Sequence, residues 1–157
     1  MEGYPLDGIR IVDFTWAWAG AHAVTTLALL GAEVIKVESP NGGDSLRHYG
    51  PFPNDVPHPE KSGLFLYLNA NKKSITLNWH TEMGRKILGR LVSQVDILVE
   101  NYGPGATVDY ELLRKPNPSM IIASISYFGL TGDYRNYRGS DIVAQAMGGI
   151  MALTGLP

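Results

Sequence analysis

The sequence predicts an α/β protein with an open, mostly parallel, Rossmann-like sheet that carries helices on both faces. A short apolar run over residues 9–14 is followed by a helix-like run over 21–30 and a second apolar run over 33–38. This succession is the β-α-β unit from which parallel sheets are built. Strand-like and helix-like runs continue to alternate along the rest of the chain, as in sheets that are covered by helices.

Composition agrees with one globular unit and argues against several classes of function. The chain has 157 residues, of which 45% are hydrophobic and 18% are charged, and its net charge is −2. The chain therefore lacks the excess of positive charge that would indicate a nucleic acid or a membrane as a partner. The chain has no cysteine, which excludes thiolate catalysis, and its four histidines show no ligand spacing, so we expect no metal site. Without a secretory leader or a membrane-length apolar run, we expect a cytoplasmic protein.

Local patterns predict the elements that follow the first β-α-β unit. Residues 39–62 are rich in Pro, Gly, Asn and Asp and predict a long loop, a feature that often carries function. The apolar run 63–69 favours a short helix, and the alternation over 73–79 predicts a strand. Thr81 is a plausible N-cap for a helix that reaches Val92. The remaining elements are expected in the order strand 96–100, turn 101–106, helix 110–115, strand 120–126, loop 127–139 and helix 141–153.

Several residues that could bind a phosphorylated nucleotide lie in the loops next to the predicted strands. In parallel sheets, ligands bind at the carboxyl ends of the strands. The turn over residues 16–20 has a single glycine, where a dinucleotide loop needs three, so NAD and FAD are disfavoured. Each candidate alone is more often a core or solvated residue, but together they favour a binding site. The candidates are the polar residues Lys72, Lys73, His80, Asn101, Arg135, Arg138, Ser140 and Asp141, and the aromatic residues Trp16, Trp18 and Tyr102.

Six segments in order resemble the family III CoA-transferases, the group that includes formyl-CoA transferase and the carnitine CoA-transferases. They are residues 6–15, 30–38, 69–75, 99–105, 126–132 and 141–149. The resemblance runs from Leu6 to Pro157. It implies that residues 1–157 are the N-terminal part of a large CoA-binding domain, that a second domain and C-terminal segments are absent from the chain, and that the full-length protein is an interlocked homodimer.

The resemblance also implies roles for individual residues in binding CoA and acyl-CoA, which are substrates rather than tightly bound cofactors. The implied CoA-binding residues form four groups: Trp16, Ala17, Trp18 and Ala19 along the CoA and acyl pocket, Leu77 and His80 near the adenine, Asn101, Tyr102 and Gly103 in a CoA-contacting turn, and Arg138, Gly139 and Ser140 near the thioester. Lys72 and Lys73 complete the predicted CoA-binding set, and Asp141 is expected to be an acid that supports the nucleophile.

The family mechanism implies covalent catalysis by an aspartate. Its carboxylate attacks the acyl-CoA thioester to give a mixed anhydride, CoA returns to form an enzyme thioester, and an acceptor carboxylic acid then takes over the CoA. The resemblance places this aspartate beyond Pro157, so we expect the 157 residues alone to be inactive. The basic residue that usually follows Gly105 is also missing, which puts one phosphate contact in doubt.

Trp18 stands where formyl-CoA transferase has a glutamine, which argues against a formyl or oxalyl substrate. Residues 14–20 are most similar to transferases for aromatic or dicarboxylic acids, such as benzylsuccinate CoA-transferase. Two alternatives remain. A 2-methylacyl-CoA racemase would carry a histidine where this chain has Ser140, which cannot take a proton near neutral pH. A non-catalytic CoA-binding or subunit-interaction module would need no nucleophile.

Overall fold

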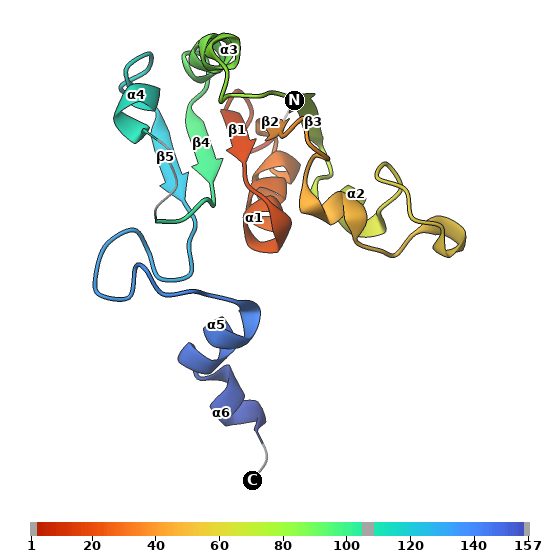
Figure 1. Cartoon of the computed structure of the whole chain (residues 1–157). Helices are drawn as coiled ribbons and strands as arrows, with labels where there is room; N and C mark the ends of the chain where they lie inside the picture. Colours follow the sequence, from red (N-terminus) through yellow and green to blue (C-terminus); the bar gives the residue numbers. More distant parts are fainter. Residues whose placement is uncertain (1–2, 105–108, 156–157) are drawn as a thin grey trace.

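The computed structural model describes residues 3–104 and 109–155 and contains a five-stranded sheet (Figure 1). The strand order is β3-β2-β1-β4-β5, and all four pairings are parallel. The predicted parallel α/β fold is therefore confirmed. The strands are β1 (Arg10–Phe14), β2 (Glu33–Glu38), β3 (Lys72–Thr76), β4 (Ile97–Glu100) and β5 (Ile121–Ser124).

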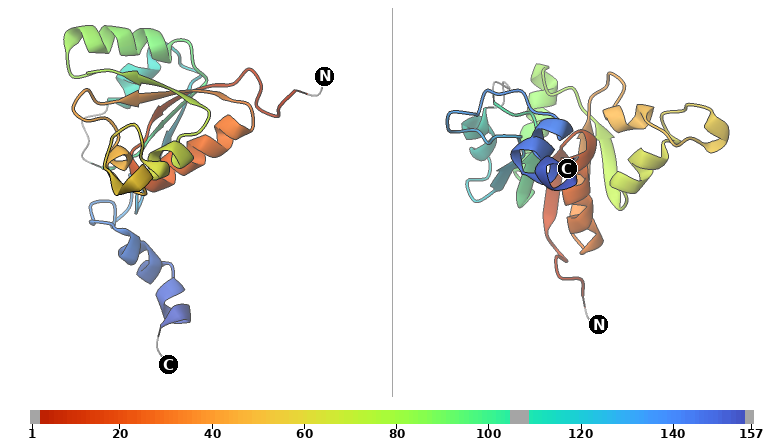
Figure 2. Two further views of the ribbon diagram at one scale, coloured as in Figure 1. Left: turned by 90° about the vertical axis from the view of Figure 1, so that its right-hand side faces the viewer. Right: turned by 90° about the horizontal axis from the view of Figure 1, so that it is seen from below.

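Helices cover both faces of this sheet, as predicted (Figures 1 and 2). Strand residues alternate between the faces: Ile11 packs with helix α1, whereas its neighbour Val12 packs with helix α3. The short helix α2 packs on α1 through a cluster that includes Ala21 and Phe65. The helices are α1 (Ala17–Leu29), α2 (Gly63–Leu68), α3 (Glu82–Val92), α4 (Tyr110–Arg114), α5 (Asp141–Met147) and α6 (Ile150–Thr154), with 3₁₀ turns η1 (Ser45–His48) and η2 (Pro53–Asp55).

Three expected elements differ most from the structure. Helix α1 begins at Ala17 rather than at residue 21. Strand β3 ends at Thr76 rather than at Trp79, because the Asn78 carbonyl accepts hydrogen bonds from the Thr81 amide and hydroxyl and so forms the turn into α3. The expected final helix is two helices, since Gly149 has a φ of 80°, a left-handed conformation that ends a helix. The Thr81 cap is confirmed by a 3.0 Å bond from the Gly84 amide.

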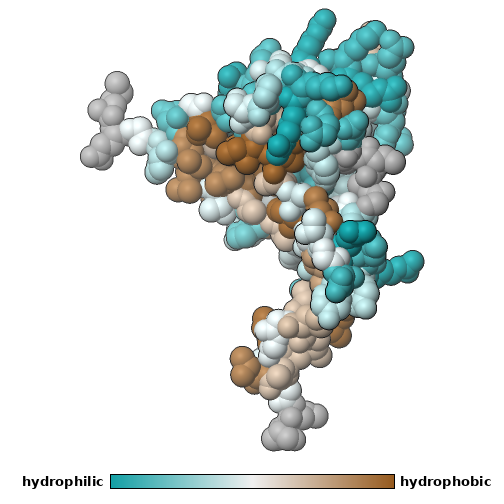
Figure 3. Space-filling view, turned by 90° about the vertical axis from the view of Figure 1, so that its left-hand side faces the viewer, coloured by the Kyte–Doolittle hydropathy of each residue, from teal (hydrophilic) through white to brown (hydrophobic). Residues whose placement is uncertain are grey.

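Helices α5 and α6 form an arm that projects beyond the carboxyl ends of the strands (Figures 1 and 2). Neither helix has a buried residue. Large apolar side chains on the arm are exposed, including Ile142, Met147 and Leu153, and apolar residues are visible along it in the space-filling view (Figure 3). Among the described residues, no helix has the length and apolar character needed to span a membrane. The predicted turn over 101–106 extends into residues 105–108, which lie outside the described residues.

Candidate functional site

The candidate site lies at the carboxyl ends of β1, β2 and β4. From β1 the chain continues to β2 and β3 on one side of the sheet and then returns to form β4 and β5 on the other side of β1. Such switch points are where open α/β sheets bind their ligands. The turn after β1 meets the turn after β4 there. The Trp16 amide donates a 2.9 Å hydrogen bond to Oδ1 of Asn101, and Nδ2 of Asn101 donates a 2.8 Å bond to the Trp16 carbonyl.

Aromatic rings from three connections gather beside this contact. The ring centroids of Trp16 and Tyr102 are 6.0 Å apart, as are those of Trp79 and Tyr102. Trp79 also lies 5.3 Å from His80 and 5.1 Å from Phe14. The structure thus brings the predicted residues Trp16, His80 and Tyr102 together. The sequence analysis missed Trp79, whose position at the end of an apolar strand pattern was the available signal.

A buried carboxylate fixes the backbone of Tyr102. Glu100 is fully buried at the end of β4; its Oε2 accepts a 2.6 Å bond from the Tyr102 amide and its Oε1 a 2.7 Å bond from the Tyr110 hydroxyl. Burial raises the pKa of the Tyr102 phenol to about 12, so this hydroxyl stays protonated at neutral pH. Gly103 follows with a φ of 74°, which a glycine adopts without strain. Leu77 is buried in the core beside Trp79.

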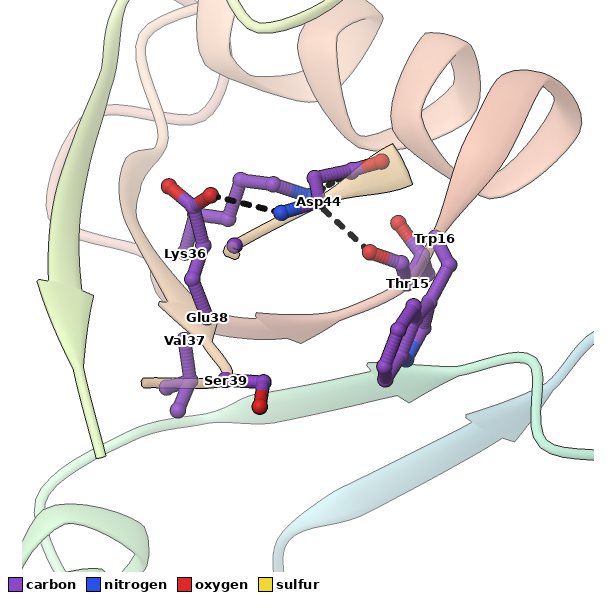
Figure 4. Close-up of a pocket in the computed structure, with 8 residues that line it drawn as sticks. Thr15, Trp16, Lys36, Val37, Glu38, Ser39 and Asp44 are labelled. Carbon is purple, nitrogen blue, oxygen red and sulfur yellow. Dashed lines mark hydrogen bonds and ion pairs between the residues drawn. The ribbon is translucent and has the colours of Figure 1, made fainter. Parts of the chain in front are cut away.

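A small hollow that is open to solvent lies between the ends of β1 and β2 (Figure 4). Lys36 is one of the charged residues that line it. Nζ of Lys36 lies 2.8 Å from Oδ2 of Asp44 and donates a 2.9 Å bond to the Thr15 carbonyl. Both side chains of this ion pair are almost fully buried. Lys36 and Asp44 were not predicted; the signal was a charged residue inside the apolar run 33–38. The hollow is lined by Thr15, Trp16, Lys36, Val37, Glu38, Ser39, Gly43 and Asp44.

Glu38 anchors the long loop after β2 to the sheet. Nε and Nη2 of Arg47 donate bonds of 2.7 and 2.8 Å to its carboxylate, and the Ser74 hydroxyl and the Asp44 amide donate further bonds of 2.6 and 2.9 Å. Burial raises the pKa of Glu38, but the hydrogen bonds from Arg47, Ser74 and Asp44 outweigh it and hold the pKa at about 2. The Arg47 guanidinium also lies 3.8 Å over the Phe65 ring, a favourable cation–π arrangement.

We expect the protein to lose stability in acid through Glu38. Its folded-state pKa of about 2 lies below the ordinary value of 4.5, so its contribution is present above pH 4.5 and is lost as the pH falls through 2. Glu38→Gln should lower the free energy of unfolding at pH 7 by about 1–2 kcal/mol, allowing for solvent screening, and flatten its pH dependence in this window. Urea unfolding at several pH values measures both effects.

The matched control is Glu60→Gln, because Glu60 binds the same arginine from an exposed position. We expect this variant to keep both the stability and the pH dependence of the parent chain. Equal behaviour of the two variants would show that the buried contacts of Glu38 do not stabilise the protein.

The first turn of α1 carries the remaining predicted residues of the Trp16 group. Ala17 has a φ of 58°, which is left-handed and costs a residue with a Cβ about 1–2 kcal/mol. Its amide is 3.4 Å from Oδ1 of Asp44. Trp18 is 59% exposed and Ala19 is also exposed, so both present surface to solvent beside Trp16.

The two predicted lysines do not join this group. Lys72 begins β3, and its Nζ lies 2.8 Å from Oδ2 of Asp13, 2.9 Å from the Ala21 carbonyl and 3.0 Å from Oδ1 of Asn69. Its side chain is 1% exposed, and burial lowers its pKa. The next residue, Lys73, is exposed and forms an ion pair with Glu33 at the other end of β2. The expected gathering of these cations at the carboxyl edge is therefore not observed.

The segment 138–141 leads into α5, the first helix of the arm, which projects away from the sheet (Figure 1). Asp141 is exposed, and its Oδ2 accepts a 2.6 Å bond from Nε2 of Gln145 one turn later in α5. Arg138 is exposed, and Gly139 lies against Tyr127, where an added Cβ would be 1.9 Å from the ring. Ser140 is the N-cap of α5 but makes no side-chain capping bond. Across residues 3–104 and 109–155, no group of three His, Cys, Asp or Glu side chains has a metal-binding arrangement.

A sequence model of CoA-transferase family III matches residues 6–157. The chain belongs to this family. Among curated relatives, it is 42% identical over 154 residues to formyl-CoA:oxalate CoA-transferase from Streptomyces avermitilis. This alignment covers 96% of this chain and 36% of the relative. It is 43% identical over 156 residues to succinyl-CoA:glutarate CoA-transferase from Mus musculus, covering 96% of this chain and 35% of the relative.

Two solved structures are similar to almost the whole of this chain. A CAIB/BAIF family protein from Brucella suis superimposes with a TM-score of 0.88 at 41% identity, covering 99% of this chain and 42% of that protein. A hypothetical protein from Mycobacterium tuberculosis gives a TM-score of 0.83 at 36% identity, over 99% of this chain and 42% of that protein. This chain therefore spans less than half of the length of the curated relatives and solved structures it matches.

Proposed function

We propose that this chain forms the CoA-binding part of an enzyme that moves CoA between an acyl-CoA thioester and a free carboxylic acid. The observation that carries the proposal is the contact of Trp16 with Asn101 and Tyr102 at the switch point of the sheet. Membership of CoA-transferase family III supports the reaction class. Similar relatives act on oxalate and on glutarate; because Trp18 argues against an oxalyl group, a dicarboxylic acid longer than oxalate is the acceptor class we favour.

The aromatic group suits the adenine and the pantetheine of CoA. Trp16, Trp79 and Tyr102 offer ring faces, and stacking of a base on an aromatic side chain contributes about 1–3 kcal/mol. On this proposal the exposed Trp18 lines the acyl end of the pocket, where its large apolar surface favours a bulkier acyl group than formyl.

We propose that the reaction uses a nucleophilic aspartate from a part of the protein that corresponds to the length of the relatives that this chain does not cover. We therefore propose that Asp141 supports the nucleophile rather than replacing it, and that the complete protein works as an interlocked homodimer. These residues alone should bind CoA without transferring it. CoA transfer from succinyl-CoA to oxalate or glutarate by the purified 157-residue chain would refute this assignment.

Binding of CoA to this chain tests the site. We expect calorimetry to detect CoA binding, and Tyr102→Ala to weaken it about tenfold, because one stacking contact of roughly 1.4 kcal/mol is removed. Tyr67→Ala is the matched control, since Tyr67 is 71% exposed on α2 and contributes no ring to the site. Equal affinity of both variants and the parent would place the CoA site elsewhere.

A further inference from the structure

Asn101 satisfies both backbone groups of a single residue in another connection. Its Oδ1 accepts the Trp16 N–H at 2.9 Å, and its Nδ2 donates to the Trp16 carbonyl at 2.8 Å, although the two residues are 85 positions apart. Trp16 is the N-cap of α1, and its own side chain makes no capping bond. The amide of Asn101 therefore supplies partners that the local sequence does not provide.

The backbone that Asn101 holds is under strain. Ala17, the next residue, has a φ of 58°, and such conformations persist where the surrounding structure over-determines them. The carbonyl of Thr15, on the other side of Trp16, accepts a 2.9 Å bond from the buried Nζ of Lys36. The Trp16 turn, residues 15–17, is thus fixed from β2 on one side and from the end of β4 on the other.

The end of β4 is itself a rigid support. Tyr102 follows Asn101, its ring contacts Trp16, and its amide is bound at 2.6 Å by the fully buried Glu100. Glu100 pairs in register with Phe14, two residues before Trp16. Asn101 and Tyr102 therefore hold the backbone and the ring of Trp16 from one anchored segment.

We propose that Asn101 is a positioning residue, which fixes the Trp16 turn before a ligand arrives and so lets the Trp16 ring act as a rigid wall toward a CoA thioester. This inference rests on the proposed function for its ligand, but not for its effect on the free chain. A wall that is already ordered costs no ordering free energy on binding. Asn101 thus raises affinity through Trp16 rather than through its own contact with CoA.

Amide hydrogen exchange of the unliganded chain tests the positioning directly. In Asn101→Ala, we expect the amides of residues 16–18 to exchange at least about tenfold faster, because the turn opens more readily. Asn101→Asp keeps an acceptor for the Trp16 amide but loses the donor, so intermediate exchange is expected. Asn117→Ala is the matched control: Nδ2 of Asn117 also binds a backbone carbonyl, that of Val95 at 2.8 Å, and this variant should leave residues 16–18 unchanged.

Calorimetry with CoA separates positioning from direct contact. We expect Asn101→Ala to raise the Kd for CoA about tenfold, with Asn101→Asp between it and the parent. Lower affinity with unchanged exchange at residues 16–18 would overturn the proposal, because Asn101 would then act by touching the ligand. If the parent chain does not bind CoA, the proposed function fails, whereas the exchange of residues 16–18 still decides whether Asn101 positions the turn.

Discussion

Replacing Lys72 with methionine is expected to lower the free energy of unfolding by about 3–5 kcal/mol, the usual cost of removing one partner of a buried ion pair. Asp13 is fully buried on β1, and Nζ of Lys72 lies 2.8 Å from its Oδ2. Without this cation, the buried carboxylate of Asp13 loses its ion-pair partner, which is costly in a poorly solvated environment. Urea unfolding at pH 7, followed by tryptophan fluorescence, measures the loss.

Lys73→Met is the matched control, because Lys73 is the next residue and its side chain is 70% exposed beside Glu33. An exposed ion pair contributes at most about 1 kcal/mol, so this variant should unfold close to the parent. If Lys72→Met were as stable as Lys73→Met but bound CoA less tightly, the Asp13 pair would be unimportant, and Lys72 would be a ligand contact instead.

The ion pair of Lys72 with Asp13 could not be predicted from the sequence, although the strands that carry both residues could. Apolar runs predicted four of the five strands, because a buried strand needs apolar side chains on both faces whatever its partners are, and an alternating pattern predicted the mostly exposed β3. The partner of Lys72 depends on the register of β3 against β2 and on the reach of a long side chain across to β1. No local pattern specifies that distance, so a buried structural lysine and a lysine that binds phosphate have the same appearance in the sequence.

For the candidate site, the sequence predicted which residues would lie together but not which contacts they would make. Strand ends indicated that Trp16, Asn101 and Tyr102 would meet, since the carboxyl ends of parallel strands share one edge. The sequence did not indicate what Asn101 would contact, because a turn-forming asparagine and one that binds a distant backbone are alike in composition. Lys36 and Asp44 were missed for the same reason: their pairing requires the long loop after β2 to fold back over the sheet.

Gly20→Ala should be the second severe substitution, with a loss of about 2–3 kcal/mol, near the upper end of the usual cost of overpacking. A Cβ at Gly20 would lie 2.5 Å from Cβ and 2.6 Å from Cγ2 of Thr15. Thr15 cannot easily yield, because it is buried and its hydroxyl donates a 2.6 Å bond to Oδ1 of Asp13. Either this bond breaks or the first turn of α1 moves away from β1, and both displace Trp16. Urea unfolding should therefore show the loss, together with weaker CoA binding in calorimetry.

Gly89→Ala separates this steric effect from the general effect of adding a methyl group to a helical glycine. Gly89 lies within α3, and an added Cβ there meets no atom within 4 Å. Because alanine favours the helix more than glycine, Gly89→Ala should raise the free energy of unfolding by about 0.5–1 kcal/mol. The two variants carry the same chemical change with opposite expected signs. If Gly20→Ala also stabilised the chain, Thr15 would have room to move, and the Trp16 turn would be less rigid than its contacts with Asn101 and Lys36 imply.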